Sequence, residues 1–208
     1  MKNFYLVQNP LVKRDVTILR DKNTNQAAFR AALNRVAFSL AVEISNSFGL
    51  VEIDVETPLE KTKGYKLARQ IILVPVLRAG LSMVSSFLEI IPDAKVGHIG
   101  LQRDEKTLEP MDYYYKTPKN LDESVTIVLD PMLATGGSAV ASFNSLKRGG
   151  AKKCVLASLI AAPEGVKKMN DEHPDISIYT AALDRELNSV GYILPGLGDA
   201  GDRTFGTL

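Results

Sequence analysis

The sequence has few of the residues that build metal sites or disulfide frameworks, with one cysteine and two histidines among 208 residues. A single cysteine, Cys154, cannot form an intramolecular disulfide, and its place in an apolar run predicts core packing. His98 and His173 lie far apart in the sequence, with no metal-ligand spacing around either. The sequence therefore predicts no metal site made of side chains alone.

Long apolar runs and an excess of one charge are also missing. No run approaches the roughly 20 apolar residues that a membrane-spanning helix needs. Residues 1–17 are interrupted by Asn9, Pro10 and charges, unlike a signal peptide, so we expect a cytoplasmic protein. Lys and Arg number 25 against 24 Asp and Glu, and this net charge of +1 indicates no bulk attraction to nucleic acid or membrane.

Two common nucleotide-binding motifs are absent, but a different glycine-rich turn is present. No GxGxxG fingerprint occurs, and Gly137 stands where a P-loop would have its lysine. Residues 125–129 are an unbroken aliphatic and β-branched run, typical of a strand buried on both faces, and this run ends at Asp130. Glycines and a helical pattern follow.

A strand that passes through glycines into a helix can hold one phosphate. Backbone N–H groups and the positive end of the helix dipole both face the anion. The carboxylate of Asp130 would then bind sugar hydroxyls, as ribose 5-phosphate requires. The alternative is that Asp130 or Thr135 merely caps the helix.

The rest of the chain alternates predicted strands and helices. Residues 1–22 show no clear period, and we interpret them as an arm that packs elsewhere on the protein. Residues 23–48 carry an apolar stripe at helical spacing, 51–57 alternate as in a half-exposed strand, and 61–66 read as a polar link. We expect further strands over 71–77, 94–102, 112–117, 153–162 and 176–183, and further helices over 81–91, 139–147 and 164–170.

This alternation predicts one α/β domain over residues 1–208, with ligands at the carboxyl ends of parallel strands. Residues 104–111 are charged and lack apolar anchors, which favours an exposed, mobile loop. Residues 184–208 form a glycine-rich tail whose apolar residues, among them Tyr192 and Phe205, favour an ordered segment over a disordered end.

The sequence Leu129-Asp130-Pro131-Met132-Leu133-Ala134-Thr135-Gly136-Gly137-Ser138 resembles the loop with which type I phosphoribosyltransferases bind phosphoribosyl pyrophosphate (PRPP). Most members have two adjacent acids at the strand end. Pro131 replaces the second acid here, a variant that resembles the uracil phosphoribosyltransferases. The tail sequence Gly198-Asp199-Ala200-Gly201-Asp202-Arg203 resembles the uracil-binding segment of that family.

The resemblance implies a fold and an activity. The fold would be α/β, a parallel-sheet type I phosphoribosyltransferase fold with flanking helices and a small hood from the chain ends. The activity would convert uracil and PRPP to UMP and diphosphate in pyrimidine salvage. Mg²⁺ would be carried by PRPP. A homo-oligomer is implied, and GTP activates some members.

The resemblance also implies site residues. Arg78 and Arg103, each placed after a predicted strand, would bind the pyrophosphate, and Asp199 would orient the base beside PRPP. The residues expected to have catalytic roles are Asp130, Arg78, Arg103 and Asp199. Those expected to bind PRPP are Arg78, Arg103, Asp130, Pro131, Met132, Leu133, Ala134, Thr135, Gly136, Gly137, Ser138 and Asp199. Uracil would be bound at Ile193, Gly198, Asp199 and Ala200, and residues 94–117 would include a flexible lid.

Two other functions stay open at this point. One is a regulator that keeps a PRPP pocket but binds RNA or DNA; it would need a basic face, and no Lys/Arg cluster stands out. The other is a purine-using phosphoribosyltransferase, against which the tail sequence argues.

Overall fold

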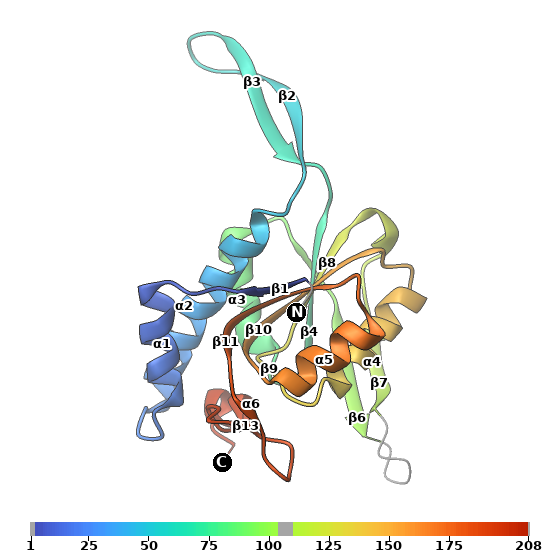
Figure 1. Ribbon diagram of the computed structural model, residues 1–208. Helices are drawn as coiled ribbons and strands as arrows, with labels where there is room; N and C mark the ends of the chain where they lie inside the picture. The colour runs from blue at the N-terminus through green and yellow to red at the C-terminus, as the bar shows by residue number, and fades with distance from the viewer. Residues whose placement is uncertain (1–2, 104–109, 208) are drawn as a thin grey trace.

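The computed structural model describes residues 3–103 and 110–207, and gives only the backbone for 101–103 and 110–113. Within this part of the chain, one sheet of nine strands lies between two layers of helices (Figure 1). Its strands are β1 (Phe4–Leu6), β4 (Ile71–Leu77), β5 (Lys95–Val96), β6 (His98–Arg103), β7 (Pro110–Lys116), β8 (Val125–Leu129), β9 (Met132–Leu133), β10 (Lys153–Ala161) and β11 (Ser177–Leu183).

The sheet is parallel except at one edge. The strand order is β1-β11-β10-β8-β4-β6-β7; β5 also pairs with β4, and β9 with β10. Only the pair β6–β7 is antiparallel within this sheet of the described residues. Strands β10, β8 and β4 at its centre are largely buried and mostly aliphatic because helices cover both faces. The predicted parallel α/β fold is confirmed.

Helices α1 (Pro10–Arg20), α2 (Gln26–Ser45) and α3 (Leu81–Ile90) cover one face of the sheet. Helices α4 (Gly137–Arg148) and α5 (Pro163–Glu172) cover the other face, and a short 3₁₀ turn, η1 (Leu121–Glu123), precedes β8 (Figure 1). Phe29, Leu33 and Leu40 of α2 are fully or almost fully buried, which confirms the apolar stripe predicted there. No helix within the described ranges is long and apolar enough to cross a membrane.

The first 22 residues are more ordered than the sequence indicated. They form the edge strand β1 and the amphipathic helix α1, which Asn9 caps by accepting from the N–H groups of Leu11 and Val12. These elements pack on α2 and β11, as expected for an arm that packs elsewhere on the protein, but the sequence did not predict their regular structure. The apolar period of α1 was hidden because only four positions of the helix are buried, among them the charged Asp15.

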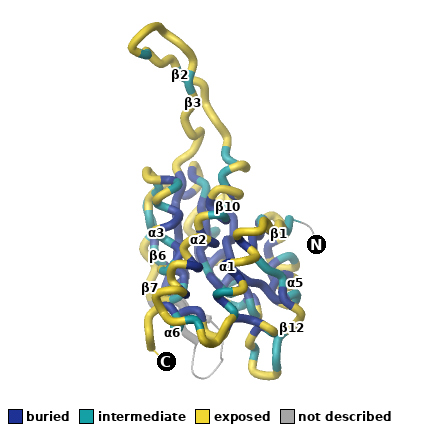
Figure 2. Tube along the Cα trace, turned by 90° about the vertical axis from the view of Figure 1, so that its left-hand side faces the viewer, coloured by how far each residue is buried: buried dark blue, intermediate teal, exposed yellow. Residues whose placement is uncertain are grey.

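Residues 50–67 form a separate hairpin of β2 (Leu50–Glu56) and β3 (Lys61–Leu67), which projects from the amino end of β4 (Figures 1 and 2). The polar link predicted over 61–66 is thus a strand. The strand expected over 51–57 is confirmed as β2, but both of its faces are largely exposed, so the expected half exposure was wrong. The exposed residues include Leu59 and Tyr65.

The remaining elements follow the predictions with shifted ends. The strand expected over 94–102 is two strands, β5 and β6, and the helix expected from Ala139 begins at Gly137. The tail contains β12 (Glu186–Leu187), β13 (Ile193–Leu194) and α6 (Ala200–Phe205). In Figure 1 the tail lies at the end of the sheet opposite the hairpin, where the central parallel strands end.

Candidate active site

Asp130 lies directly after β8 and is held by hydrogen bonds from Met132, two residues further along the chain, and from Ser158 of β10. Its Oδ1 accepts from the N–H of Met132 at 3.3 Å, and its own carbonyl accepts from the hydroxyl of the buried Ser158 at 2.7 Å. Burial raises the pKa of the Asp130 carboxyl to about 6, although the hydrogen bond from Met132 acts in the opposite direction. Asp130 as a residue has intermediate exposure, and no hydrogen bond of the described residues engages its Oδ2, which can therefore accept from a ligand.

Residues 130–138, the phosphate loop, wrap around a small cavity. This cavity of about 150 Å³ is lined by Met132, Leu133, Ala134, Thr135, Gly136, Gly137, Ser138, Ala139 and Gly191. The Thr135 and Ser138 side chains are exposed. Because α4 begins at Gly137, the first N–H groups of this helix have no intrahelical acceptor and lie beside the same loop.

Two glycines let the phosphate loop pack closely on α5. Gly136 has φ +78°, and a Cβ there would lie 3.1 Å from the carbonyl oxygen of Gly165. A Cβ on Gly165 would lie 2.4 Å from the carbonyl oxygen of Ala134. The backbone conformation of the loop is therefore fixed by contacts that leave no room for side chains.

Residues 78–80, the arginine loop, connect β4 to α3 next to Asp130. A Cβ on Gly80 would lie 2.2 Å from the carbonyl oxygen of Leu129, so the arginine loop packs on the end of β8, directly before the phosphate loop. Arg78 is largely exposed, and its Nη2 lies 3.2 Å from Oδ1 of Asp202 in α6. The other predicted arginine, Arg103, ends β6, but its side chain is outside the described residues, as is most of the predicted mobile loop 104–111.

Residues 193–199, the tail loop, contain three of the four residues predicted to bind uracil. Gly198 is exposed with φ +79°, and neither its N–H nor its C=O has a hydrogen-bond partner within the described part of the chain. Asp199 is exposed and caps α6, its Oδ1 accepting from the N–H of Asp202 at 2.9 Å. Ile193 and the fourth residue, Ala200, are buried in the core, so they could meet a ligand only through the backbone.

The three loops lie beside one another, as close approaches at their flanking residues show. Gly80 approaches Leu129, which directly precedes the phosphate loop. Gly201 and Gly191 flank the tail loop; a Cβ on Gly201 would lie 3.6 Å from Cβ of Ala79, and one on Gly191 would lie 3.6 Å from Cγ2 of Thr135. The structure thus places the residues predicted to bind the phosphate, the pyrophosphate and the base together at the carboxyl ends of the central strands. All of the predicted residues except the undescribed side chain of Arg103 lie in or beside these loops.

Two features of this region were not predicted from the sequence. Ser158 fixes the carbonyl of Asp130 from a neighbouring strand, and Arg20 with Asp184 fixes the tail loop. These contacts join residues 28, 164 and 176 positions apart, and no local pattern marks them.

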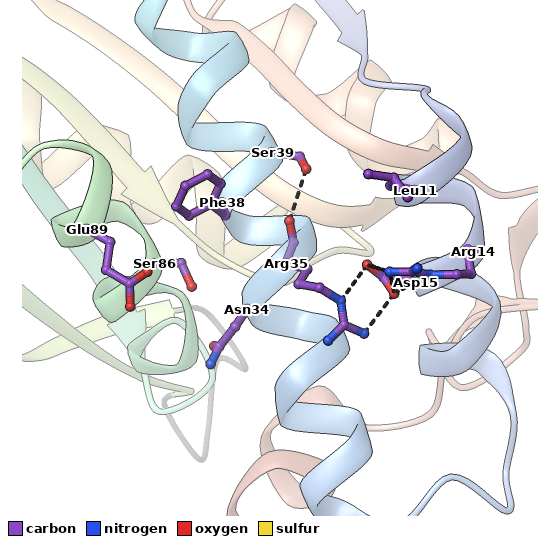
Figure 3. A pocket seen from close by; sticks show the side chains of 9 residues that line it. All are labelled: Leu11, Arg14, Asp15, Asn34, Arg35, Phe38, Ser39, Ser86 and Glu89. Carbon is purple, nitrogen blue, oxygen red and sulfur yellow. Dashed lines mark hydrogen bonds and ion pairs between the residues drawn. The ribbon is translucent and has the colours of Figure 1, made fainter.

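Two negative observations help to define this site. A larger cavity of about 380 Å³ lies between α1, α2 and α3, and it shares no residue with the three loops (Figure 3). Among the described residues, no group of three or more His, Cys, Asp or Glu side chains could hold a metal ion.

The sequence and the fold both match known proteins along nearly the whole chain. A family model described as uracil phosphoribosyltransferase matches residues 6–207. Proteins named uracil phosphoribosyltransferase from Bacillus cytotoxicus and Bacillus thuringiensis are 53% and 52% identical over 208 residues, with 100% of each chain covered. The solved structure of the AQ2163 protein from Aquifex aeolicus is 36% identical, covers 97% of both chains and has a TM-score of 0.91.

More distant structures share the fold. A purine phosphoribosyltransferase from Pyrococcus horikoshii superimposes with a TM-score of 0.53 at 16% identity, covering 74% of this chain and 87% of that one. This likeness concerns the fold alone. Because the family model and the full-length relatives agree, the chain belongs to the uracil phosphoribosyltransferase family.

Proposed function

We propose that this chain transfers the phosphoribosyl group of PRPP to uracil, giving UMP and diphosphate in pyrimidine salvage. The observation that carries the proposal is that the three loops lie beside one another. They bring an acid, a cavity beside a helix N-terminus, an arginine and an exposed glycine backbone to the carboxyl ends of the central strands. PRPP and uracil together require those four kinds of partner.

PRPP would occupy the phosphate loop and the arginine loop. Its 5-phosphate fits the cavity beside Thr135 and Ser138, where hydroxyls and helix N–H groups can donate to oxygen. Asp130 would accept from the ribose hydroxyls. Arg78 would donate to the pyrophosphate, because a guanidinium can bond two phosphate oxygens at once. Arg103 is proposed for the same task by family resemblance.

Uracil would be read by the backbone of the tail loop. Along one edge uracil presents an acceptor at O2, a donor at N3 and an acceptor at O4. The unpaired N–H and C=O of Gly198 could serve two of these groups. Cytosine places a donor at the position of O4 and has no proton on N3, so buried groups would be left unpaired.

The reaction would need no nucleophilic side chain. The bond from N1 of uracil to C1 of the ribose forms as the bond from C1 to the pyrophosphate oxygen breaks. The electron pair of the broken bond leaves with diphosphate, and the N1 proton is released. The protein would hold the two reactants in line and stabilise the charge of the leaving group through Arg78 and Arg103. Asp199 would orient the base.

Mg²⁺ would arrive with PRPP. This ion prefers phosphate oxygens and water to an all-protein cage. Bound there, it would neutralise part of the pyrophosphate charge. We expect the protein to act in the cytoplasm, and activation by GTP stays a prediction from the family.

The projecting hairpin supports the prediction of a homo-oligomer. A two-stranded hairpin is marginally stable alone, and this one exposes Leu59, Tyr65 and other apolar side chains on both strands. Packing against a second copy would cover them. The mass of the protein in solution tests this, since a hairpin-dependent oligomer should dissociate when residues 52–65 are replaced by a short turn.

Product analysis tests the proposal. The protein is incubated with Mg²⁺, uracil and PRPP, and UMP and diphosphate are quantified. We expect equal amounts of the two products, and no diphosphate above background without uracil. If UMP does not form, the proposal fails. Binding of RNA or DNA that weakens steeply with salt, without UMP formation, would favour the regulator instead.

A further inference from the structure

Two consecutive carbonyl groups of the tail loop are held by arginines from different parts of the chain. Arg20 Nη1 donates to the carbonyl of Gly196 at 2.9 Å, and Arg203 Nη1 donates to the carbonyl of Leu197 at 2.8 Å. Arg20 is the last residue of α1, while Arg203 lies in α6. The next residue is Gly198, whose backbone has no partner among the described residues.

Asp184 completes the arrangement around Gly196. Both its carboxylate oxygens bind the guanidinium of Arg20, Oδ2 accepting from Nη1 at 2.8 Å, and Oδ2 also accepts from the N–H of Gly196 at 2.8 Å. The Asp184 side chain is 3% exposed. Both backbone polar groups of Gly196 are thus fixed by one buried ion pair.

Arg203 fixes the other side of the tail loop. It donates to the carbonyls of Leu19 and of Asp21, the latter at 2.7 Å, and its guanidinium lies 4.3 Å from the ring centre of Phe29. These contacts join α6 to the end of α1 and to α2. Both arginines therefore tie the tail loop to the first helical layer of the protein.

We propose that Arg20, Asp184 and Arg203 are positioning residues that hold the tail loop in the shape that receives the base. This inference rests on the proposed function. The carbonyls of Gly196 and Leu197 already accept from arginines, whereas the N–H and C=O of Gly198 have no partner among the described residues, so we assign recognition to Gly198 and its neighbours. A loop fixed before binding loses less conformational entropy when the ligand arrives, and this lowers the concentration of base required. PRPP binds to the other two loops, so its affinity should change little.

The test compares Arg20→Gln with a matched variant remote from the tail. Asp15 lies in α1, as Arg20 does, and is buried, as Asp184 is. It accepts from Arg35 Nε and Nη2 at 2.8 Å each, between α1 and α2 (Figure 3). Arg35→Gln removes an ion pair to a buried carboxylate without touching the tail loop, while Arg14 still pairs with Asp15. For both variants we would measure kcat, KM for uracil, KM for PRPP and Tm.

Arg20→Gln should raise KM for uracil by about tenfold or more, because the tail loop loses the charge-assisted hydrogen bond at Gly196 together with the ion pair that supports it, and change KM for PRPP by less than about twofold. Arg35→Gln should lower Tm and leave KM for uracil unchanged. The inference is wrong if Arg20→Gln shifts both KM values equally, or if it leaves KM for uracil at the wild-type value.

A second variant keeps the test decisive if Arg20→Gln does not fold. Arg203→Lys retains a cation over Phe29 but cannot reach three carbonyls at once, because its ammonium lacks the planar fork. We expect the same selective rise in KM for uracil, and equal shifts for the two substrates would overturn the inference. A wild-type protein that forms no UMP would instead reject the proposed function itself.

Discussion

Nη2 of Arg78 lies 3.2 Å from Oδ1 of Asp202, so an ion pair joins the arginine loop to α6. The Arg78 side chain is 61% exposed, and an exposed pair of this kind contributes about 0–1 kcal/mol to stability. A largely exposed arginine that directly follows a buried strand thus adds little to the fold itself. Its position beside the phosphate loop is consistent with a role in binding.

Arg78→Lys should separate binding from stability. Lysine keeps the charge and can still pair with Asp202, but it loses the fork that bonds two phosphate oxygens. We expect kcat/KM for PRPP to fall by about 10- to 100-fold, and the free energy of unfolding to change by less than about 0.5 kcal/mol. Asp202→Asn is the control for the ion pair alone. If Arg78→Lys has wild-type kinetics, the assignment of Arg78 to PRPP binding is wrong.

Asp130→Asn should lower the activity and raise the stability of the protein. The raised pKa of Asp130, about 6, shows that burial disfavours its charged form. At pH 8 the wild-type protein holds this carboxylate ionised, so an uncharged amide should raise the free energy of unfolding by about 1–3 kcal/mol. Loss of the acceptor for the ribose hydroxyls should lower kcat/KM for PRPP by about 100-fold. Urea unfolding and steady-state kinetics measure the two effects, and unchanged kinetics would contradict the assignment.

The same group predicts a pH dependence. Below pH 6 the Asp130 carboxyl takes up a proton and becomes a poorer acceptor for hydroxyl groups, so kcat/KM for PRPP should decline as pH falls from 7 to 5. PRPP itself titrates in this range. The residual activity of Asp130→Asn supplies the correction, and the decline must be steeper in the wild type.

Gly198→Val should block the base and spare PRPP. Gly198 has φ +79°, a conformation that a β-branched residue rarely adopts, and the side chain would point toward Cδ of Arg203 at 3.5 Å. We expect kcat/KM for uracil to fall at least about 100-fold, while PRPP binding measured by calorimetry is retained. Gly150→Val is the matched control, because Gly150 has φ +97° and nothing lies within 4 Å of the added Cβ. If both variants lose uracil turnover equally, the effect is one of stability.

His173 should make stability depend on pH. It is buried against α4, where Nδ1 lies 3.1 Å from the Lys147 ammonium and Nε2 lies 3.4 Å from the Val140 carbonyl. Burial, and then the charge of Lys147, hold the pKa of His173 below its usual value of 6.5. The stability that neutral, buried His173 contributes is complete above pH 6.5. It is lost as pH falls below that value, because the unfolded chain binds the proton more readily than the folded one.

Urea unfolding between pH 8 and 5 measures this effect. His173→Gln should be less stable at pH 8, since its packing against Phe143 is lost, but its stability should fall less steeply with pH. The pKa of Asp175 is lowered although burial opposes this shift. Protonation of Asp175 therefore affects stability only at more acidic pH and does not interfere with the measurement between pH 8 and 5. Equal slopes for the two proteins would contradict the prediction.

The strands that carry the candidate site at their carboxyl ends could be predicted, because a strand buried on both faces has a nearly continuous apolar sequence. The prediction of a strand over 71–77 matches β4, and the run 125–129 matches β8, since apart from Pro75 and Thr126 both consist of aliphatic residues bounded by polar ones. The phosphate loop followed from Asp130 and its glycines. In each case the signal lies within a few residues of chain.

The elements that escaped prediction depend on partners distant in sequence. Helix α1 buries only a narrow stripe that includes Asp15, whose burial depends on Arg35 in the next helix. Strand β3 is polar because it belongs to an exposed hairpin. The pairing of Arg20 with Asp184 spans 164 residues, so no local pattern in the sequence indicates a role for Arg20.

The measurement that tests the central claim most directly is a competition among bases. The protein is given PRPP with uracil, 5-fluorouracil, cytosine and hypoxanthine at equal concentration, and each nucleotide product is quantified. Recognition by the backbone around Gly198 predicts turnover of uracil and of 5-fluorouracil, because position 5 is not on the hydrogen-bonding edge. It also predicts rejection of cytosine by about 10⁴-fold. Comparable turnover of hypoxanthine, or PRPP binding without turnover of uracil, would contradict the account.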